Sequence, residues 1–316
     1  MDGLRRRPCA PLQLLLLAST LVLFAFAAAC GDSSSPVQPT PLSSPSAATS
    51  AGPELLVGAG DIARCGPDLV AAEATARLLD SIVGGTVFTT GDNTQVSGTA
   101  EEFRDCYGST WGRHLYRTRP APGNHDVQTA GGAGYFGYFG SQAGPAGLGY
   151  YSYDLGAWHI ISLNGNVSMK AGSAQANWLR QDLEASRALC TLAYWHQPLF
   201  SSGSHGNDSR SAYAWQLLYD YGAEIVLNGH DHLFERFAPQ DPTGFRDDTR
   251  GIRQFTVGTG GNALDAAIHL QPNSEVQGTA HGVLKLMLQA ASYHWQFIPV
   301  SGRSFSDSGR GTCHAR

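Results

Sequence analysis

Four short segments rich in glycine, aspartate and histidine each follow an apolar run that predicts a buried strand. In chain order they are Gly60-Asp61, Gly91-Asp92-Asn93, Gly123-Asn124-His125-Asp126 and Gly229-His230-Asp231-His232, and His196 lies between the last two. Residues that follow strands lie at the edge of a sheet, where a rigid framework can hold several polar side chains close together. The pattern therefore predicts an α/β fold with a polar site on one rim.

These segments supply the ligands that divalent and trivalent metals take in proteins: two carboxylates, an amide oxygen and several imidazoles. Asp61 and Asp92 each follow a glycine, which allows the backbone to turn close to an ion. His230 and His232 are two residues apart, so in an extended segment their side chains point to the same side. Each segment alone is compatible with a surface turn, but their order and their positions after strands favour a metal centre.

The first 53 residues differ in composition from the rest of the chain. Three arginines at positions 5–7 precede an apolar run over residues 12–29, which is typical of a secretory signal. A retained membrane anchor is the weaker interpretation, because the run is barely long enough to span a bilayer. Residues 30–53 are mostly Ser, Pro, Thr and Ala, as in a disordered tether. We expect a signal peptide over 1–29, a tether over 30–53 and a folded domain over 54–316.

The junction Ala27-Ala28-Ala29-Cys30 resembles a bacterial lipobox, in which the cysteine is lipidated. Cleavage after Ala29 without lipid is the alternative. We therefore expect an exported protein, either attached to the bacterial cell envelope through lipid on Cys30 or secreted. The net charge of -5 and the lack of a basic run after the N-terminus give no electrostatic footprint for nucleic acid.

Four cysteines remain beyond the signal, and an even number in an exported chain favours two disulfides, although three pairings are compatible with the sequence. We expect Cys65–Cys106, which would join the two early metal loops. We also expect Cys190–Cys313, which would fasten the C-terminal tail to the strand before His196. Free buried thiols are the alternative.

Apolar periodicity predicts the order of elements in the domain. A strand over 54–60, a helix over 68–82 and a strand over 86–90 form a βαβ unit. Residues 128–149, rich in Gly, Tyr and Phe, predict an irregular loop. Further predicted elements are a hairpin over 150–163, helices over 173–186 and 211–221, and strands over 191–195, 224–227, 252–257, 282–288 and 293–300. This order fits a layered α/β sandwich.

Taken together, the motifs resemble those of the calcineurin-like metallophosphoesterases, and within them the purple acid phosphatase branch. The resemblance covers about residues 54–300, and Gly-Asn-His-Asp and Gly-His-Asp-His are its most specific parts. It implies a catalytic domain over 54–316, folded as a sandwich of two mixed β-sheets flanked by helices. It also implies two metal sites that share Asp92. Asp61 and His232 would complete the first site; the second would be completed by Asn124, His196 and His230.

The resemblance further implies a phosphate ester substrate, attacked by a hydroxide that two divalent metal ions hold. Two cations about 3.5–4 Å apart stabilise both the attacking and the leaving oxygen and lower the pKa of the water between them. His125 would contact the phosphate and assist the leaving group, and Asp126 would support its loop. His205 would reach the phosphate, with a mobile polar loop as the alternative. Histidines without partner spacing are expected to be structural, namely His114, His159, His269, His281, His294 and His314. The aromatic side chains Tyr135, Phe136, Tyr138 and Phe139 are expected to pack rather than stack on substrate.

Two positions depart from the family pattern. The wider family has a histidine where this chain has Ala63, and the purple branch has a tyrosine where it has Gln95. The first metal site therefore keeps Asp61, Asp92 and His232. Gln95 would add a neutral oxygen, or else be an outer polar residue. Without a phenolate ligand, a pair of divalent ions such as zinc, manganese or ferrous iron is favoured.

The sequence thus predicts an exported, dinuclear-metal phosphoric ester hydrolase, and both monoesters and diesters are compatible with its residues. The alternative is a metal- or phosphate-binding protein of the same fold that lost turnover because its first metal site has few ligands. Peptide cleavage fits less well, because no glutamate stands beside a ligand histidine as it does in metalloproteases.

Overall fold

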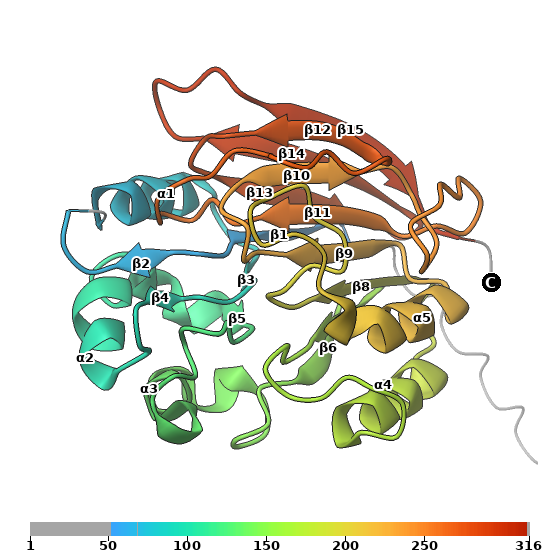
Figure 1. Cartoon of the computed structure of the whole chain (residues 1–316), viewed down its shortest axis with the longest axis horizontal. Coiled ribbons are helices and arrows are strands. Elements are labelled where there is room, and N and C mark those ends of the chain that lie inside the picture. Colours follow the sequence, from blue (N-terminus) through green and yellow to red (C-terminus); the bar gives the residue numbers. More distant parts are fainter. Residues whose placement is uncertain (1–51, 68, 315–316) are drawn as a thin grey trace, which may run out of the picture. The chain divides into compact units, whose positions relative to one another are not determined.

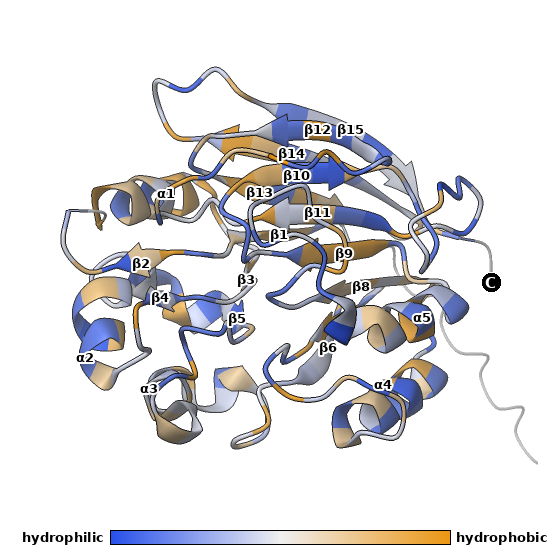
Figure 2. Cartoon of the chain, viewed as in Figure 1, coloured by the Kyte–Doolittle hydropathy of each residue, from blue (hydrophilic) through white to orange (hydrophobic). Residues whose placement is uncertain are grey.

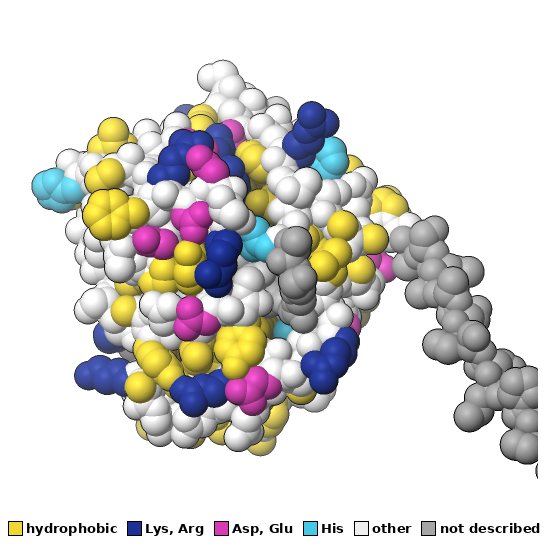
Figure 3. Space-filling view, turned by 90° about the vertical axis from the view of Figure 1, so that its right-hand side faces the viewer, with side chains coloured by type: hydrophobic (Ala, Val, Ile, Leu, Met, Phe, Trp, Pro, Cys, Tyr) yellow, Lys and Arg dark blue, Asp and Glu magenta, His cyan; other side chains and the backbone are white. Residues whose placement is uncertain are grey.

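The computed structural model describes residues 52–67 and 69–314, which form two β-sheets with helices against them (Figure 1). The predicted signal peptide, Cys30 and almost all of the predicted tether lie outside these residues. No helix in the described part of the chain has both the length and the apolar character needed to cross a bilayer. On the face shown in Figure 3, basic, acidic and apolar side chains are interspersed, so this face is mixed in charge.

The first sheet has six strands in the order β15-β14-β13-β1-β3-β5. They are β1 (Glu54–Ala59), β3 (Thr86–Thr89), β5 (Thr118–Pro120), β13 (Gly282–Leu288), β14 (Ser292–Pro299) and β15 (Asp307–Thr312). β1, β3 and β5 run parallel, whereas β13, β14 and β15 extend the sheet in antiparallel pairs. The carboxyl ends of β1, β3 and β5 therefore lie at the same edge.

The second sheet has seven strands in the order β12-β10-β11-β9-β8-β7-β6. They are β6 (Tyr151–Leu155), β7 (Trp158–Ser162), β8 (Cys190–Tyr194), β9 (Ile225–Asn228), β10 (Phe234–Phe237), β11 (Arg253–Val257) and β12 (Ser274–Gly278). β7, β8, β9 and β11 run parallel. The two mixed sheets confirm the predicted fold class, and the β6–β7 pair is the predicted hairpin.

The two sheets are joined at their carboxyl edges. The N–H of Gly60, directly after β1, donates to the carbonyl of Val257 at the end of β11, at 2.8 Å. A third, two-stranded sheet pairs β2 (Ala63–Arg64) with β4 (Thr94–Gln95) in parallel, and so links the loops that follow β1 and β3. Polar segments that are far apart in the sequence are thereby brought to one rim.

Alternation along the central strands explains the core. On β8, Leu192 and Tyr194 belong to the cluster that both sheets share, whereas Ala193 faces the opposite side. Since successive side chains of a strand point to opposite faces, a strand covered on both sides must be apolar at every position. Figure 2 shows this in the hydrophobic colouring of much of the central strands.

Helices cover the outer faces of the sheets. α4 (Ala174–Ala185) and α5 (Ala212–Asp220) pack over the second sheet, where Leu179 and Trp215 meet Ala193. α1 (Leu69–Ser81) packs its buried stripe against β13 of the first sheet. The side chain of Ser173 accepts a hydrogen bond from the N–H of Ala176, which caps α4 and explains where it begins. The shorter helices are α2 (Ala100–Glu102), α3 (Ala133–Phe139), the π-helical turn η1 (Phe103–Tyr107) and the 3-10 turns η2 (Trp111–Arg117), η3 (Ala130–Gly132), η4 (Gly140–Ala143) and η5 (Ser209–Ser211).

The prediction of an irregular loop over residues 128–149 is wrong, because this region contains α3 and two 3-10 turns. Tyr135 and Phe139 lie one helical turn apart on α3 and are buried against Phe103. Glycine lowers helix propensity and so concealed this helix. Gly134 is required by packing, since a Cβ there would lie 2.1 Å from the Gly98 carbonyl oxygen. Tyr135 and Phe139 are therefore core residues, and the half-buried Phe136 and Tyr138 pack against the core, as expected.

Both predicted disulfides are present. Cys65–Cys106 has a Cα–Cα distance of 5.3 Å, and Cys190–Cys313 has 5.5 Å. The second ties the start of β8 to the segment after β15, as predicted. The first joins the residue after β2 to η1, and the direct link between the Asp61 and Asp92 loops is made by the β2–β4 pair instead.

Candidate metal centre

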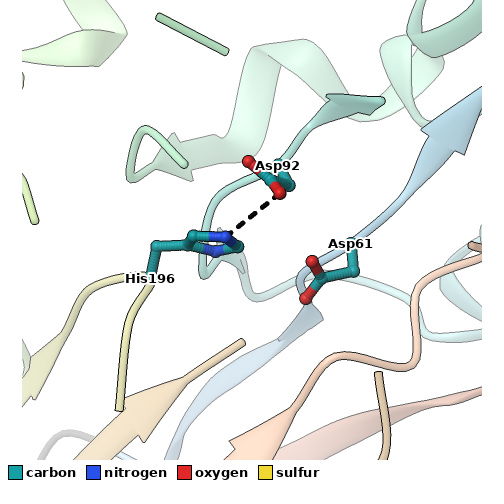
Figure 4. A group of neighbouring side chains, drawn as sticks. All are labelled: Asp61, Asp92 and His196. Carbon is teal, nitrogen blue, oxygen red and sulfur yellow. Dashed lines mark ion pairs between the residues drawn. The ribbon is translucent and has the colours of Figure 1, made fainter. Parts of the chain in front are cut away.

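Asp61, Asp92 and His196 meet where the carboxyl ends of β1, β3 and β8 converge. All three side chains are buried, and one candidate ligand atom from each lies within 4.8 Å of the others. Figure 4 shows the three side chains pointing toward one another. The site therefore draws on both sheets, as the positions of the motifs after predicted strands suggested.

The two aspartates stand in strained backbone. The φ angles of Asp61 and Asp92 are 56° and 48°, in the left-handed region that residues with a Cβ seldom adopt. The N–H of Asp61 donates to the carbonyl of Gly91 at 3.0 Å, so each sharp turn supports the other. Such strain concentrates at functional sites, where the surrounding structure imposes it.

Glycines beside the motifs allow the loops to touch. A Cβ at Gly123 would lie 2.1 Å from the backbone nitrogen of Asp92, and one at Gly229 would lie 2.6 Å from Oδ2 of Asp61. Neither contact is sterically allowed. These glycines are thus needed for close approach between loops, and neither has the positive φ that a sharp turn would require.

Asp92 is the most heavily contacted carboxylate among the candidate ligands. Its Oδ2 lies 3.1 Å from Nε2 of His196 and 3.3 Å from the amide nitrogen of Gln95, and its Oδ1 accepts the backbone N–H of His125 at 2.8 Å. Burial opposes ionisation, but the adjacent His196 and then His125 hold the pKa of Asp92 below its usual value. Asp92 is therefore a charged group with partners on two sides.

Among the candidate ligands, two buried oxygens have no hydrogen-bond donor: Oδ1 of Asp61 and Oδ1 of Asn124. Asn124 lies between Gly123 and His125, both of which contact Asp92. Buried polar atoms in proteins are nearly always satisfied, and an unsatisfied carboxylate oxygen is costly. Open acceptors beside buried carboxylates are what a cation would coordinate, so the donor set fits a metal.

The ring orientations of the histidines also fit metal ligation. Nδ1 of His196 lies 2.8 Å from the carbonyl of Thr90, and Nδ1 of His232 lies 2.9 Å from the carbonyl of Ala263. A carbonyl accepts Nδ1–H, which leaves Nε2 of each ring with its lone pair, as in most metal-ligating histidines. The Nε2 atoms face the carboxylates: that of His232 is 3.3 Å from Oδ1 of Asp61.

The carboxylates and the rings perturb one another strongly. Although burial opposes it, Asp92 and Asp61 raise the pKa of His196 to about 9, and Asp61 raises that of His232 to about 9. Burial, followed by repulsion from His196, lowers the pKa of His230 to about 4. The two carboxylates thus demand compensating positive charge, which protons on His196 and His232 or metal ions would supply.

The extended conformation expected for His230 and His232 is wrong. His230 has a φ of 72°, and tight bonds from Asp231 N–H to the Gly229 carbonyl and from Leu233 N–H to the Asp231 carbonyl bend the segment. The reason is topological: β9 and β10 run in opposite directions on either side of β11. Both rings still reach the site, because Nδ1 of His230 lies 3.3 Å from Nε2 of His196.

His125 and His205 stand at the open side of the site. Nδ1 of His125 lies 2.9 Å from the carbonyl of Val96, and its Nε2 lies 4.0 Å from Oδ2 of Asp92 with the side chain 34% exposed. The His205 ring lies 4.2 Å from the His230 ring and is 47% exposed. Both imidazoles are therefore adjacent to the candidate ligands and accessible to a substrate.

Asp126 holds the neighbouring loops together through hydrogen bonds. It is fully buried and accepts hydrogen bonds from the N–H groups of Gly123, Asn93 and Thr94 and from the Asn93 side chain, at 2.8–3.1 Å. Burial, followed by repulsion from Asp92, raises the pKa of Asp126 to about 7. Its oxygens are occupied by these donors, which leaves them poorly placed for a cation.

Sequence reasoning missed several partners of the site. The carbonyls of Thr90 and Ala263, which orient the ligand rings, carry no sequence signal because any residue offers a carbonyl. Asp231, by contrast, lies within the Gly-His-Asp-His motif and holds His205. Ala63 is buried in β2 opposite Thr94 and offers no ligand atom.

Two of the histidines expected to be structural lie beside carboxylates. Nε2 of His114 lies 3.0 Å from Asp80, and the ring of His159 lies between Asp154 and Asp182 at 2.9 and 2.7 Å. Neither contact includes a candidate ligand of the metal centre.

Comparisons with known proteins agree with this geometry. Residues 49–234 match the family model for calcineurin-like phosphoesterases. Purple acid phosphatase 15 of Arabidopsis thaliana is 29% identical over 177 residues, which are 50% of this chain and 33% of the relative. Purple acid phosphatase 18 of the same plant is 31% identical over 119 residues, 36% of this chain and 27% of the relative. The chain thus spans about a third of the length of these curated relatives.

Solved structures show the same fold. A purple acid phosphatase from yellow lupin (Lupinus luteus) seeds has a TM-score of 0.66 at 17% identity, over 84% of this chain and 55% of that chain. GAP50, the anchor in the inner membrane complex of Plasmodium, has a TM-score of 0.66 at 12% identity, over 84% of this chain and 90% of that chain. Because the family model matches more than half of the chain and includes the segments that form the metal centre, this protein belongs to the calcineurin-like phosphoesterase family.

Proposed function

We propose that this protein is a metal-dependent phosphoric ester hydrolase that binds two divalent cations at the rim where the two sheets meet. The observation that carries the proposal is the buried group of Asp61, Asp92 and His196, with donor-free oxygens on Asp61 and Asn124 beside it. A buried cluster of this composition favours compensating cations, and its oxygen and nitrogen donors suit zinc, manganese or ferrous iron.

The contacts support the division of ligands between two sites. His232 faces Asp61, which favours one site of Asp61, Asp92 and His232. His196 faces both Asp92 and His230, which favours a second site of Asp92, His196, His230 and Asn124. These residues would hold two cations, which would supply Lewis acidity for the attack of water on phosphorus.

Gln95 supports Asp92 rather than the metal in this proposal. Its amide nitrogen donates to Oδ2 of Asp92 at 3.3 Å, and the residue is almost fully buried. A side chain that holds the shared carboxylate from one side restricts its rotation. The first site then has fewer protein ligands than the second, and it also lacks a phenolate.

His125 is the proposed catalytic residue of this chain. Its backbone N–H is fixed on Asp92 and its Nδ1 on the carbonyl of Val96, so its Nε2 is directed toward the open side of the site. From there it stabilises phosphate charge and donates a proton to the leaving oxygen. His205, on the other side of His230, is the proposed second contact to the phosphate.

We further propose that the protein is exported. Its two disulfides favour an oxidising compartment. A lipid on Cys30 in a bacterial envelope remains a prediction, which mass spectrometry of the mature N-terminus would test.

The test is hydrolysis of an aryl phosphate monoester and of a bis-aryl phosphate diester by purified protein, with single divalent metals added back and again with chelator. Metal-dependent turnover at two bound ions per chain supports the proposal, and the faster substrate assigns monoesterase or diesterase activity. Folded protein with two bound ions and no turnover on either ester would contradict it.

The alternative is a binding protein of the same fold. GAP50 is described as an anchor, and its similarity to this chain extends to the fold alone. Tight binding of one ion or of inorganic phosphate, without turnover, would favour this alternative.

A further inference from the structure

Two buried carboxylates hold the loop that follows His196. Asp231 lies between the two histidines of the Gly-His-Asp-His motif and is fully buried. Its Oδ1 accepts the backbone N–H of His205 at 2.8 Å and lies 3.1 Å from Nδ1 of the same residue. Its Oδ2 accepts a short hydrogen bond from the hydroxyl of Ser201. The second carboxylate, Glu235 on β10, accepts the backbone N–H of Ser202 at 2.9 Å and does not contact His205.

Asp231 therefore contacts His205 at two points. The backbone contact fixes the position of the His205 main chain, and the ring contact fixes the rotation of the imidazole. A carboxylate accepts and does not donate, so Nδ1 of His205 carries the hydrogen, and Nε2 is the nitrogen left to face a substrate. The ring then lies against that of His230, with centroids 4.2 Å apart and an interplanar angle of 35°.

The loop is shaped so that Asp231 can enter it. A Cβ at Gly203 would lie 2.3 Å from Cγ of Asp231, so only glycine allows the loop to close around the carboxylate. The N–H of Gly203 donates to the hydroxyl of Ser201 at 3.0 Å, and that hydroxyl donates to Asp231. One buried side chain, Asp231, thus contacts three alternate positions of the loop: the Ser201 hydroxyl, Gly203 and the His205 ring.

An exposed histidine on a loop would otherwise sample several rotamers. Ordering such a side chain when substrate binds costs conformational entropy, and a side chain ordered in advance avoids that cost in the bound state. Partners that orient an active-site imidazole in this way typically change activity by about 10- to 100-fold when they are removed.

We propose that Asp231 is a positioning residue, which holds the His205 imidazole over the open side of the metal centre with Nε2 directed at the phosphate ester. This proposal rests on the proposed function, because His205 is taken to contact the substrate. In this proposal Asp231 itself contacts neither metal nor substrate, since its side chain is fully buried and both of its oxygens contact the loop that carries Ser201 and His205.

The first experiment observes His205 directly, without turnover. In metal-loaded protein, nitrogen NMR of the imidazoles, with His205 assigned from a His205→Gln variant, should show hydrogen on Nδ1. Asp231→Asn, with its amide oxygen at the Oδ1 position, can keep both contacts to His205 and should leave the hydrogen on Nδ1. Asp231→Ala removes the acceptor, and we expect it to shift His205 toward a mixture of the two tautomers. Glu235→Ala is the matched control, since it removes the other carboxylate that contacts this loop and should leave the His205 signals unchanged. Unchanged signals in Asp231→Ala would overturn the proposal, whether or not the protein is an enzyme.

The second experiment is a double-mutant cycle in kcat/KM with Asp231→Ala and His205→Ala. We expect each single variant to lose about 10- to 100-fold, with the loss from Asp231→Ala mainly in KM, and the double variant to lose no more than His205→Ala alone. Equal losses from Asp231→Ala in the presence and absence of His205 would overturn the proposal, because Asp231 would then act independently.

The number of bound metal ions shows whether Asp231 acts on His205 or instead supports the candidate ligands His230 and His232. Asp231→Asn and Asp231→Ala should each bind as many ions as the parent protein. Loss of an ion would overturn the proposal, because Asp231 would then be supporting His230 and His232 as ligands. A parent protein that binds two ions but turns over no ester refutes the proposed function instead, and the NMR result still decides whether Asp231 holds His205.

Discussion

Replacing Asp126 with alanine should destabilise the folded protein more than any other single change at the rim that spares the candidate ligands. The side chain is fully buried and accepts four hydrogen bonds, three of them from backbone N–H groups of the Asp92 and Asn124 loops. Alanine leaves these three donors buried without an acceptor. At about 1–3 kcal/mol for each unsatisfied group, the loss is about 3–9 kcal/mol.

An opposing effect narrows this range. Burial, then repulsion from Asp92, disfavours the ionised Asp126 carboxyl, so its removal also relieves an unfavourable interaction. We therefore expect a loss of about 3–5 kcal/mol, which is the loss usually seen when one partner of a buried charged contact is deleted. Asp126→Asn is the matched control. An amide oxygen at the Oδ2 position keeps the bonds to Gly123 and Asn93 and loses only the one to Thr94, for about 1–3 kcal/mol.

The assay is urea unfolding of metal-free protein, followed by circular dichroism, with metal affinity measured in parallel by titration. Metal affinity should fall about 10- to 100-fold in Asp126→Ala and less in Asp126→Asn, because the loops that carry Asp92 and Asn124 lose their brace. A loss of stability below about 1 kcal/mol in Asp126→Ala, or equal effects of Asn and Ala, would refute the reasoning that Asp126 acts through its acceptors.

Three further substitutions test the site and the sheet behind it. Asp92→Asn should weaken both metal ions together, as measured by titration, and loss of only one ion would contradict a shared ligand. His125→Ala should keep both ions and lower kcat by about 10²- to 10⁴-fold, whereas loss of metal would assign His125 to the ligands. His159→Gln should destabilise the protein mainly at acidic pH: although burial opposes it, bonds to Asp182 and then Asp154 raise the pKa of His159. That stabilisation is fully present below the ordinary pKa of about 6.5 and is lost as pH rises through the raised value. Urea unfolding at pH 5.5 and pH 9 should therefore show a smaller difference between parent and variant at pH 9, and a pH-independent difference would contradict the ion pairs.

The sequence predicted the fold well, and it placed the candidate ligand segments correctly after strands, because both depend on short-range patterns. Apolar runs that end in Gly-Asp or Gly-His predict strands whose ends carry polar side chains, and β1, β3, β8 and β9 all end within four residues of their candidate ligands. Hydrophobic periodicity does not show how the two sheets pack against each other. That packing places Thr90, which follows β3 of the first sheet, against His196, which follows β8 of the second. Helix α3 was missed for a similar reason, since its Gly134 is required by contact with Gly98, which is distant in the chain.

The sequence analysis assigned Asp61 and Asp92 as ligands and Asp126 as a loop residue, but local sequence gives no physical reason for the difference, because every one of these aspartates lies beside a glycine or a histidine. The number of hydrogen-bond donors separates Asp61 from Asp126 and Asp231. Asp126 accepts four hydrogen bonds and Asp231 accepts from Ser201 and from two atoms of His205, so their lone pairs are occupied. Oδ2 of Asp61 accepts a hydrogen bond from the His230 N–H, and its Oδ1 is buried without a hydrogen-bond donor. A carboxylate saturated by N–H and O–H donors holds loops together, whereas the open buried oxygen of Asp61 favours a cation. The same residue type thus performs two tasks at one rim, and the surrounding donors, which come from other loops, determine which.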